Sequence, residues 1–348
     1  MTVPLSVLDL SPVTTGSPPS AALRRSLDLA RAAEGFGYHR YWVAEHHGSP
    51  AVVSAPAVLI ASIAAATTTL RVGAGGIMLP QHRPLHVAET FRALEALHPG
   101  RIDLGVGRAP GADGRTATAL RRAAGPDGDR ARDVREDLAD LHGHVEGFVP
   151  GHPLAGVTAM PTDVPLPPVW VLGSSDHGAQ LAAEQGTGFA HAGHLGTVDP
   201  ADVLERYRRA FTPSARPGRG RPTPYAVLTV AVVVAERAGR AAELAHAATL
   251  AAVRSRLGAP APLPTPQEAA AHRWTLAERH TAGRLPPLVA GTPGEVVPQL
   301  AGLAARTGAD ELMVVTEVHD PAERTRSYEL LARAWADRGA ASAGGPNG

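Results

Sequence analysis

The stretch from Leu70 to Gly107 decides the fold: LRVGAGGIMLPQHRPLHVAETFRALEALHPGRIDLGVG. It begins with the apolar run LRVGAGGIML, which indicates a buried strand. Residues 85–97 then repeat apolar side chains at helical spacing, and RIDLGVG returns to a strand pattern. Two apolar strands separated by a helix are typical of parallel pairing, because a parallel pair of strands needs a crossover connection.

The same alternation of strand and helix recurs along the whole chain. Strand-like runs at 3–10, 38–45, 70–79, 101–107, 168–173, 188–193, 225–234 and 311–318 are each followed by a helical pattern. Eight such units predict an α/β protein with a single closed (β/α)8 TIM barrel over residues 1–340, in preference to an open sheet. Long connectors are expected after the fourth and seventh strands, at about 143–168 and 258–288, and the second is a candidate lid. Residues 341–348 are expected to form a disordered tail.

The composition excludes several classes of function. The counts of Lys+Arg and Asp+Glu are both 33, so the formal net charge is zero and neither a nucleic acid nor an anionic membrane is an expected partner. There is no cysteine, which removes disulfides and thiolate nucleophiles. No apolar run is long enough to span a membrane, and a cytoplasmic protein is predicted. Only 4% of residues are aromatic, which favours an aliphatic pocket for any substrate.

Candidate site residues follow the second and third strands. The active sites of (β/α)8 barrels lie at the carboxyl ends of the strands, and the run YWVAEHH places His46 and His47 there. Such histidines could serve as a general acid or base, as hydrogen-bond donors or as metal ligands, and one of the two could instead be a hydrogen-bonded core residue. Gly75 and Gly76 would let a planar ligand or another backbone approach closely.

A phosphate-binding pattern follows the fourth and fifth strands. Arg108, between two glycines, has the donor geometry for a phosphate, and Ser174 and Ser175 stand at the start of a helix, where free N–H groups attract anions. The serines could also simply cap the helix. Because the two elements come from neighbouring strand ends, they favour a phosphorylated cofactor. The spacing of GVGRAPG does not match GxGxxG, which argues against a nicotinamide-binding Rossmann domain.

A metal-dependent hydrolase is a competing interpretation of the histidines. His191 and His194, near the end of the sixth strand, could join His46 and His47 around a metal ion. Pairs with this spacing arise readily in a chain with 16 histidines. We therefore predict no metal site.

Taken together, these motifs resemble the bacterial luciferase-like monooxygenases, which are flavin or deazaflavin enzymes on a (β/α)8 barrel. The resemblance extends from LARAAEGFGYHRYWVAEHH through the 67–111 segment and PPVWVLGSSDHGAQLAAEQGTGFAHA to GADELMVVT. It implies that His46 is the catalytic histidine, with His47 beside it, and that a non-prolyl cis peptide between Gly75 and Gly76 lies against the flavin ring. It also implies that Arg108, Ser174 and Ser175 bind the cofactor phosphate.

The resemblance also implies a chemistry and a set of partners. FMNH2 supplied by a separate flavin reductase would react with O2 to form a C4a-(hydro)peroxyflavin, which oxygenates a small or medium organic substrate. Gly107 stands where luciferase has a reactive cysteine, and Ser174 where it has a glutamate, so the expected reaction is not light emission. A homodimer is expected. An F420-dependent oxidoreductase acting by hydride transfer, or a non-catalytic flavin-binding protein, are the alternatives.

Overall fold

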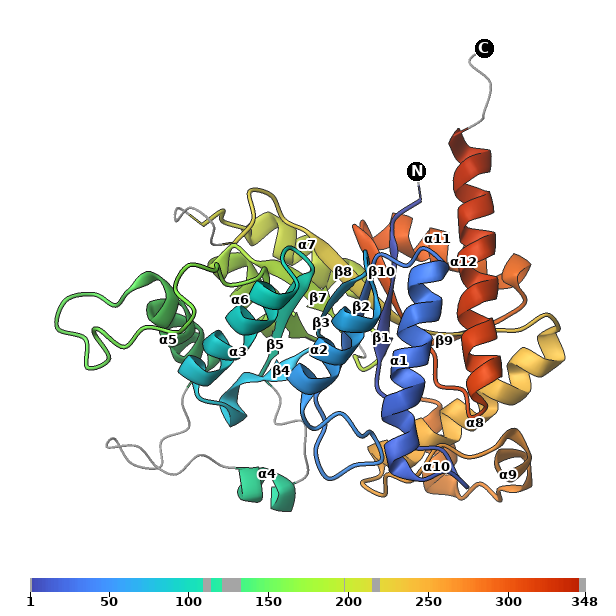
Figure 1. Ribbon diagram of the computed structural model, residues 1–348. Coiled ribbons are helices and arrows are strands. Elements are labelled where there is room, and N and C mark those ends of the chain that lie inside the picture. The colour runs from blue at the N-terminus through green and yellow to red at the C-terminus, as the bar shows by residue number, and fades with distance from the viewer. Residues whose placement is uncertain (1, 109–113, 121–132, 197, 215–219, 344–348) are drawn as a thin grey trace, which may run out of the picture.

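The computed structural model describes residues 2–108, 114–120, 133–196, 198–214 and 220–343. A closed ring of parallel strands stands at its centre, and helices surround the ring (Figure 1). The strands in the described residues are β1 (Leu5–Asp9), β2 (Arg40–Val43), β3 (Arg71–Ala74), β4 (Ile77–Met78), β5 (Ile102–Gly107), β6 (Val169–Gly173), β7 (Gly188–His191), β8 (Ala226–Val234), β9 (Leu288–Gly291) and β10 (Glu311–Val315).

Pairing between β8 and β10 closes the barrel. Leu312 of β10 lies opposite both Leu5 of β1 and Leu228 of β8, and all these pairs are parallel. The eight predicted strands correspond to β1, β2, β3 with β4, β5, β6, β7, β8 and β10, so the predicted (β/α)8 barrel is confirmed. β9 is additional and pairs with the second half of β8, where Leu288 lies opposite Ala231.

The helices connect successive strands on the outside of the barrel. They are α1 (Pro19–Gly35), α2 (Pro56–Ala66), α3 (Pro84–Leu97), α4 (Gly114–Leu120), α5 (Val134–Glu146), α6 (Asp176–Gln185), α7 (Pro200–Ala210), α8 (Ala238–Arg256), α9 (Pro266–Ala271), α10 (Leu276–Ala282), α11 (Pro293–Thr307) and α12 (Pro321–Ala343), with a 3-10 turn at Leu79–Gln81. Many begin at proline, whose fixed φ suits the first helical turn. The predicted connector at 258–288 contains α9 and α10, and both pack against α8.

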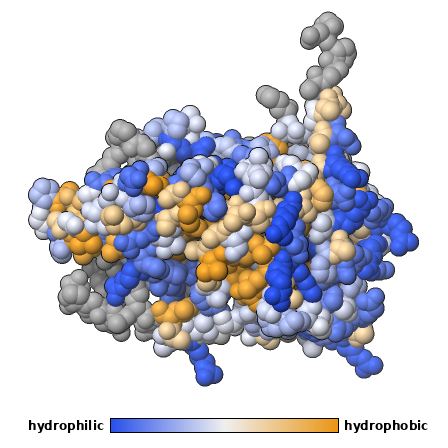
Figure 2. All heavy atoms as spheres, in the orientation of Figure 1, coloured by the Kyte–Doolittle hydropathy of each residue, from blue (hydrophilic) through white to orange (hydrophobic). Residues whose placement is uncertain are grey.

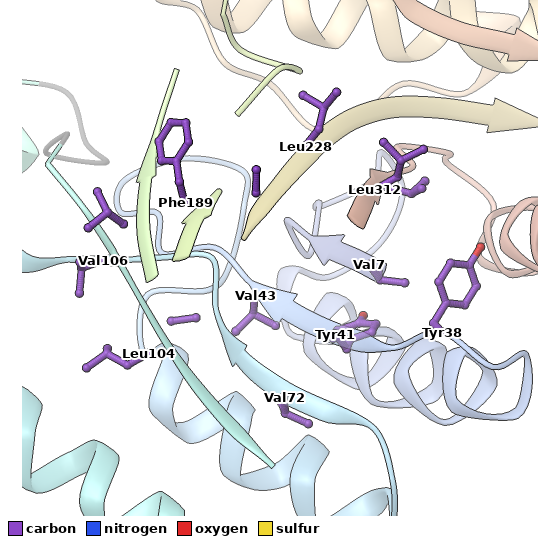
Figure 3. Close-up of a cluster of buried hydrophobic side chains, with 14 of the residues drawn as sticks. Val7, Tyr38, Tyr41, Val43, Val72, Leu104, Val106, Phe189, Leu228 and Leu312 are labelled. Carbon is purple, nitrogen blue, oxygen red and sulfur yellow. The ribbon is translucent and has the colours of Figure 1, made fainter. Parts of the chain in front are cut away.

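Alternating side chains divide the core into two layers. Outward-facing residues of the strands, such as Val7, Tyr41 and Val72, pack with the surrounding helices in one large cluster (Figure 3). Their neighbours along the strands, such as Leu8 and Trp42, point inward and fill the middle of the barrel. This period of two is what a sheet buried on both faces requires.

Charged residues fill the amino-terminal end of the barrel interior. Arg40 donates to Glu311 at 2.7 and 3.0 Å and to Asp103 at 2.7 Å. Arg71 donates to the other oxygen of Asp103 at 2.6 Å, and the indole of Trp42 donates to Asp103 at 3.1 Å. Burial would raise the pKa of Asp103, but Arg40 and Arg71 outweigh it and hold that pKa below its usual value. Asp103 is therefore ionised, and the carboxylates of the cluster are paired with arginines.

The outer surface is mixed in polarity. Figure 2 shows hydrophilic residues over most of this face and a group of apolar residues over α2, where Val58 is 69% exposed. Among the described residues, no helix has the length and apolar character needed to cross a membrane. α12 continues to Ala343, and the rest of the predicted tail lies outside the described residues.

Candidate active site

A cavity of about 250 Å³ opens at the carboxyl ends of the barrel strands, and we call it the central cavity. Its walls are mostly apolar, with a few polar groups on one side, as is usual for a cofactor or small-molecule site. The sequence-predicted residues His46, Gly75, Gly76, Arg108, Ser174 and Ser175 all line it. Further lining residues include Leu8, Trp42, Met78, Val106, Val171, His177, His194 and Met313.

His46 follows β2 and faces the central cavity. Its backbone N–H donates to the Val53 carbonyl at 2.9 Å, which holds the loop in place, while its Nδ1 is buried with no partner among the described residues. Burial lowers the pKa of His46, against opposing effects of the Ala44 carbonyl and Glu45. The imidazole is consequently neutral near pH 7 and has a free nitrogen for a ligand.

His47 is oriented differently from His46 and does not line the central cavity. Its Nε2 lies 2.7 Å from Glu45 Oε1, and His82 Nε2 lies at the same distance from that oxygen. The second oxygen of Glu45 accepts the backbone N–H of Met78 at 2.9 Å. Burial would raise the pKa of Glu45, but the bonds from His82 and His47 outweigh it and lower that pKa. The adjacent histidines therefore differ, since only one faces the cavity and the other holds a buried carboxylate.

The backbone at Gly75 and Gly76 is a non-prolyl cis peptide, at the position that the family resemblance implied. A Cβ on Gly76 would lie 2.8 Å from the Gly105 carbonyl oxygen, and a Cβ on Gly75 would lie 2.6 Å from a methyl carbon of Leu8. Glycine is required at Gly76 because the backbone of β5 approaches closely, whereas at Gly75 the nearest neighbours are side-chain atoms of Leu8 and Trp42. Both glycines also line the central cavity and leave its wall flat.

Arg108 and the serine pair lie on the polar side of the central cavity. Arg108 directly follows β5, is exposed, and has no hydrogen bond to a described residue. Ser175 is the N-cap of α6, yet its side chain makes no capping bond, and the hydroxyl of Ser174 also has no described partner. A guanidinium, two hydroxyls and the N–H groups of a helix start thus remain available to an anion.

Two histidines of the site were not predicted as cavity residues. His177, in the first turn of α6, has an Nε2 without a described partner, and His194, after β7, has an unpartnered Nδ1. The His-Ala-Gly-His spacing had drawn attention to His194 only as a possible metal ligand. Within the described ranges, no group of three or more His, Cys, Asp or Glu side chains could hold a metal ion. The geometry offers no support for a metal-dependent hydrolase.

A second cavity of about 520 Å³ adjoins the first, and we call it the side cavity. One side consists of strand ends, including Ala231, Leu288 and Val315, and the other consists of α8 and the segments around 260–263 and 282–287. Leu10, His46, His194 and Leu195 line both cavities. The predicted lid segment therefore forms part of the wall of the side cavity.

Comparison with known proteins gives the family. The model of the luciferase-like monooxygenase family matches residues 3–311, and the chain belongs to that family of enzymes. It is 41% identical to a luciferase-like monooxygenase of Escherichia coli K12, over 94% of this chain and 96% of the relative. It is 32% identical to N-acetyl-S-alkylcysteine monooxygenase of Bacillus subtilis, over 95% and 97%. The solved structure of apo-MsnO8 superimposes with a TM-score of 0.85 at 37% identity, covering 96% of this chain and 98% of that one.

More distant structures share the fold. The oxygenating constituent of 3,6-diketocamphane monooxygenase from Pseudomonas putida, solved with FMN, has a TM-score of 0.69 at 17% identity, covering 97% and 99% of the two chains. The F420-dependent tetrahydromethanopterin reductase from Methanopyrus kandleri has a TM-score of 0.65 at 15% identity, covering 97% and 99%. The same barrel therefore occurs with a flavin in one protein and with a deazaflavin in another.

Proposed function

We propose that the protein is an FMNH2- and O2-dependent monooxygenase that oxygenates a small or medium organic substrate. The observation that supports this most directly is the convergence of His46, the Gly75–Gly76 peptide, Arg108 and the serine pair on one cavity. Four different strand ends contribute these groups. Membership of the luciferase-like monooxygenase family supports the same proposal.

The residues of the central cavity fit a flavin mononucleotide. Arg108, Ser174 and Ser175 would hold its phosphate, because they combine a free cation, two free hydroxyls and a helix start. Gly75 and Gly76 would leave room for a flat ring beside the apolar wall formed by Val106 and its neighbours. When bound in its reduced state, FMN would supply the electrons that activate O2.

His46 is the proposed acid/base residue. Its neutral imidazole faces the central cavity and can accept a proton at Nδ1, which has no partner among the described residues. Glu45 acts on it indirectly by anchoring His47, His82 and the backbone of Met78, so that the loop after β2 holds His46 in place. We assign His47 to this positioning role, whereas the sequence alone had placed it among the catalytic candidates.

The proposal is tested with purified protein, FMN and a flavin reductase. FMN binding is measured by quenching of flavin fluorescence, and O2 consumption is followed with an oxygen electrode while substrates are added. We expect FMN to bind and oxygen uptake to require both FMN and the reductase. Tight binding of F420 together with no oxygen uptake would instead identify a deazaflavin oxidoreductase, the function of distant proteins with this fold.

The flavin reductase partner, the homodimer and the cytoplasmic location are further predictions. The flavin reductase is tested by the requirement for it in the oxygen-uptake assay. The predicted homodimer would use the apolar surface over α2. Analytical ultracentrifugation of the purified chain tests it, and a single monomeric species would contradict it. A cytoplasmic location would be checked by cell fractionation.

A further inference from the structure

The side cavity contains one charged group that the proposed reaction does not use. Glu317 lies two residues beyond β10, at the carboxyl rim of the barrel, and lines this cavity. Its carboxylate has no hydrogen bond or ion pair with any described residue. Glu317 is half-buried, and a carboxylate without a protein partner in a largely apolar cavity is a group to which a cationic ligand can bind.

The neighbouring charges leave Glu317 without a cation of its own. Arg324, whose positive charge acts on Glu317, donates to Asp9 at 2.7 Å and to the Thr316 carbonyl at 2.8 Å. Asp9 also accepts hydrogen bonds from Tyr41 at 2.6 Å and from the backbone N–H of Ser11 at 2.8 Å. Burial raises the pKa of Glu317, Arg324 opposes that rise and Asp9 adds to it. Asp9 and Glu317 thus share one guanidinium, and when Glu317 is ionised the two carboxylates exceed it by one negative charge.

The other ionisable groups around the side cavity do not supply a positive charge to Glu317. Arg256 is exposed on α8 and donates to the Leu195 carbonyl, and its charge helps burial to lower the pKa of His194. The charge of Arg256 therefore acts near His194, where the side cavity adjoins the central cavity. Burial also lowers the pKa of His46, so that neither imidazole supplies a cation near pH 7.

We propose that the side cavity is the substrate pocket and that Glu317 binds the amine group of an aliphatic, cationic substrate. This inference rests on the proposed function, since it places the substrate next to the flavin cavity. An ammonium group would provide the missing positive charge, and its alkyl chain would lie along Leu10, Ala231, Ala252 and Val315 toward His46. His46 lines both cavities, so the far end of such a substrate would reach the proposed reaction centre.

The experiment compares two probes of equal length, 1-aminoheptane and 1-heptanol, by titration calorimetry with the full-length protein, with and without FMN. The wild-type protein should bind the amine roughly 10- to 100-fold more tightly than the alcohol, as expected for a charge-assisted bond. Glu317→Gln should lose that preference and still bind the alcohol, which also shows that the variant is folded. Glu236→Gln, at an exposed glutamate paired with Arg326, is the matched control and should keep the preference.

A second variant tests the location. Ala252→Phe should weaken binding of both probes by filling the cavity beside α8. Equal binding of amine and alcohol by the wild-type protein, or an unchanged preference in Glu317→Gln, would overturn the proposed amine site. Competition between the amine and FMN would overturn it as well, because the two should occupy different cavities. Amine binding by a protein that does not bind FMN would overturn the proposed function and leave the amine site standing.

Discussion

The two ends of the barrel interior differ in whether their polar groups are paired within the protein. At the amino-terminal end, Arg40 makes three hydrogen bonds to Glu311 and Asp103, and both carboxylates are fully buried. At the carboxyl-terminal end, His46 and His194 each have a buried ring nitrogen with no partner in the described part of the chain. The protein pairs the two carboxylates at the first end, whereas the imidazoles at the second end keep nitrogens available to a ligand.

The difference separates residues that stabilise the fold from residues available for chemistry. A buried polar group normally has a hydrogen-bond partner, so an orphaned one is a sign of an absent ligand. In (β/α)8 barrels the carboxyl-terminal end is also where activity resides, while the opposite end contributes stability. Four predictions test this contrast, given from the largest expected effect to the smallest.

The largest effect is expected at the amino-terminal end of the barrel interior, where the charged groups are paired. Arg40→Met leaves Glu311 and Asp103 buried with reduced compensation and should lower the free energy of unfolding by roughly 3–5 kcal/mol. Urea unfolding followed by circular dichroism measures it. Arg31→Met, which removes an exposed ion pair with Asp28, is the control and should cost less than about 1 kcal/mol. Equal losses in the two variants would contradict a stabilising role for the cluster.

The next largest effect, on turnover, is expected at the carboxyl-terminal end of the barrel, where His46 faces the central cavity. His46→Ala should reduce turnover by about 10²- to 10⁴-fold, the usual contribution of a general acid or base, and leave FMN affinity largely unchanged. Steady-state oxygen uptake and fluorescence titration separate the two quantities. His47→Ala, which removes a partner of Glu45, should act mainly through a less ordered loop and lower turnover less. A greater loss of turnover in His47→Ala than in His46→Ala would reverse the two roles.

The two ends should also respond at different pH values. His191 is fully buried without a described partner, and burial lowers its pKa to about 4. Because the unfolded chain binds this proton near pH 6.5, the neutral histidine contributes stability above that pH, and the contribution is lost as the pH falls toward 4. The loss from this one group between pH 7 and pH 5 is on the order of 2 kcal/mol. Asp103, whose pKa is also lowered, loses its contribution in the same direction as the pH falls, but only below about pH 4.

Denaturant unfolding over this pH range measures the dependence. His191→Asn should flatten the fall in stability between pH 7 and pH 5, and His280→Asn, on the exposed surface of α10, should leave it as in the wild type. An identical slope in wild type and His191→Asn would show that this histidine does not titrate on unfolding.

The smallest effect is expected at Arg108, at the edge of the central cavity. Arg108→Ala should weaken FMN binding by about tenfold, because an exposed guanidinium gains less from a phosphate than a buried one would. Equilibrium dialysis gives the affinity, and Arg24→Ala on the exposed side of α1 is the control. Unchanged affinity in Arg108→Ala would show that the phosphate lies elsewhere.

The barrel and the positions of most site residues could be predicted from the order of apolar runs. A run such as LRVGAGGIML identifies a buried strand, and parallel strands bring their carboxyl ends together whatever their detailed packing. His46 and Arg108 were placed on one cavity by that rule. The adjacent His46 and His47 could not be distinguished, because which imidazole faces the cavity depends on Glu45 and on His82, 37 residues along the chain.

The sequence by itself therefore determined the barrel, the family and the edge at which the chemistry lies, because periodicity and strand order are local properties of the chain. Which polar groups are paired and which are free became known from the three-dimensional structure. Glu317 is an example. Whether it has a cation partner depends on Asp9, more than 300 residues away, because Asp9 binds the guanidinium of Arg324. Such pairing is set by distances between residues far apart in sequence, which a one-dimensional pattern does not contain.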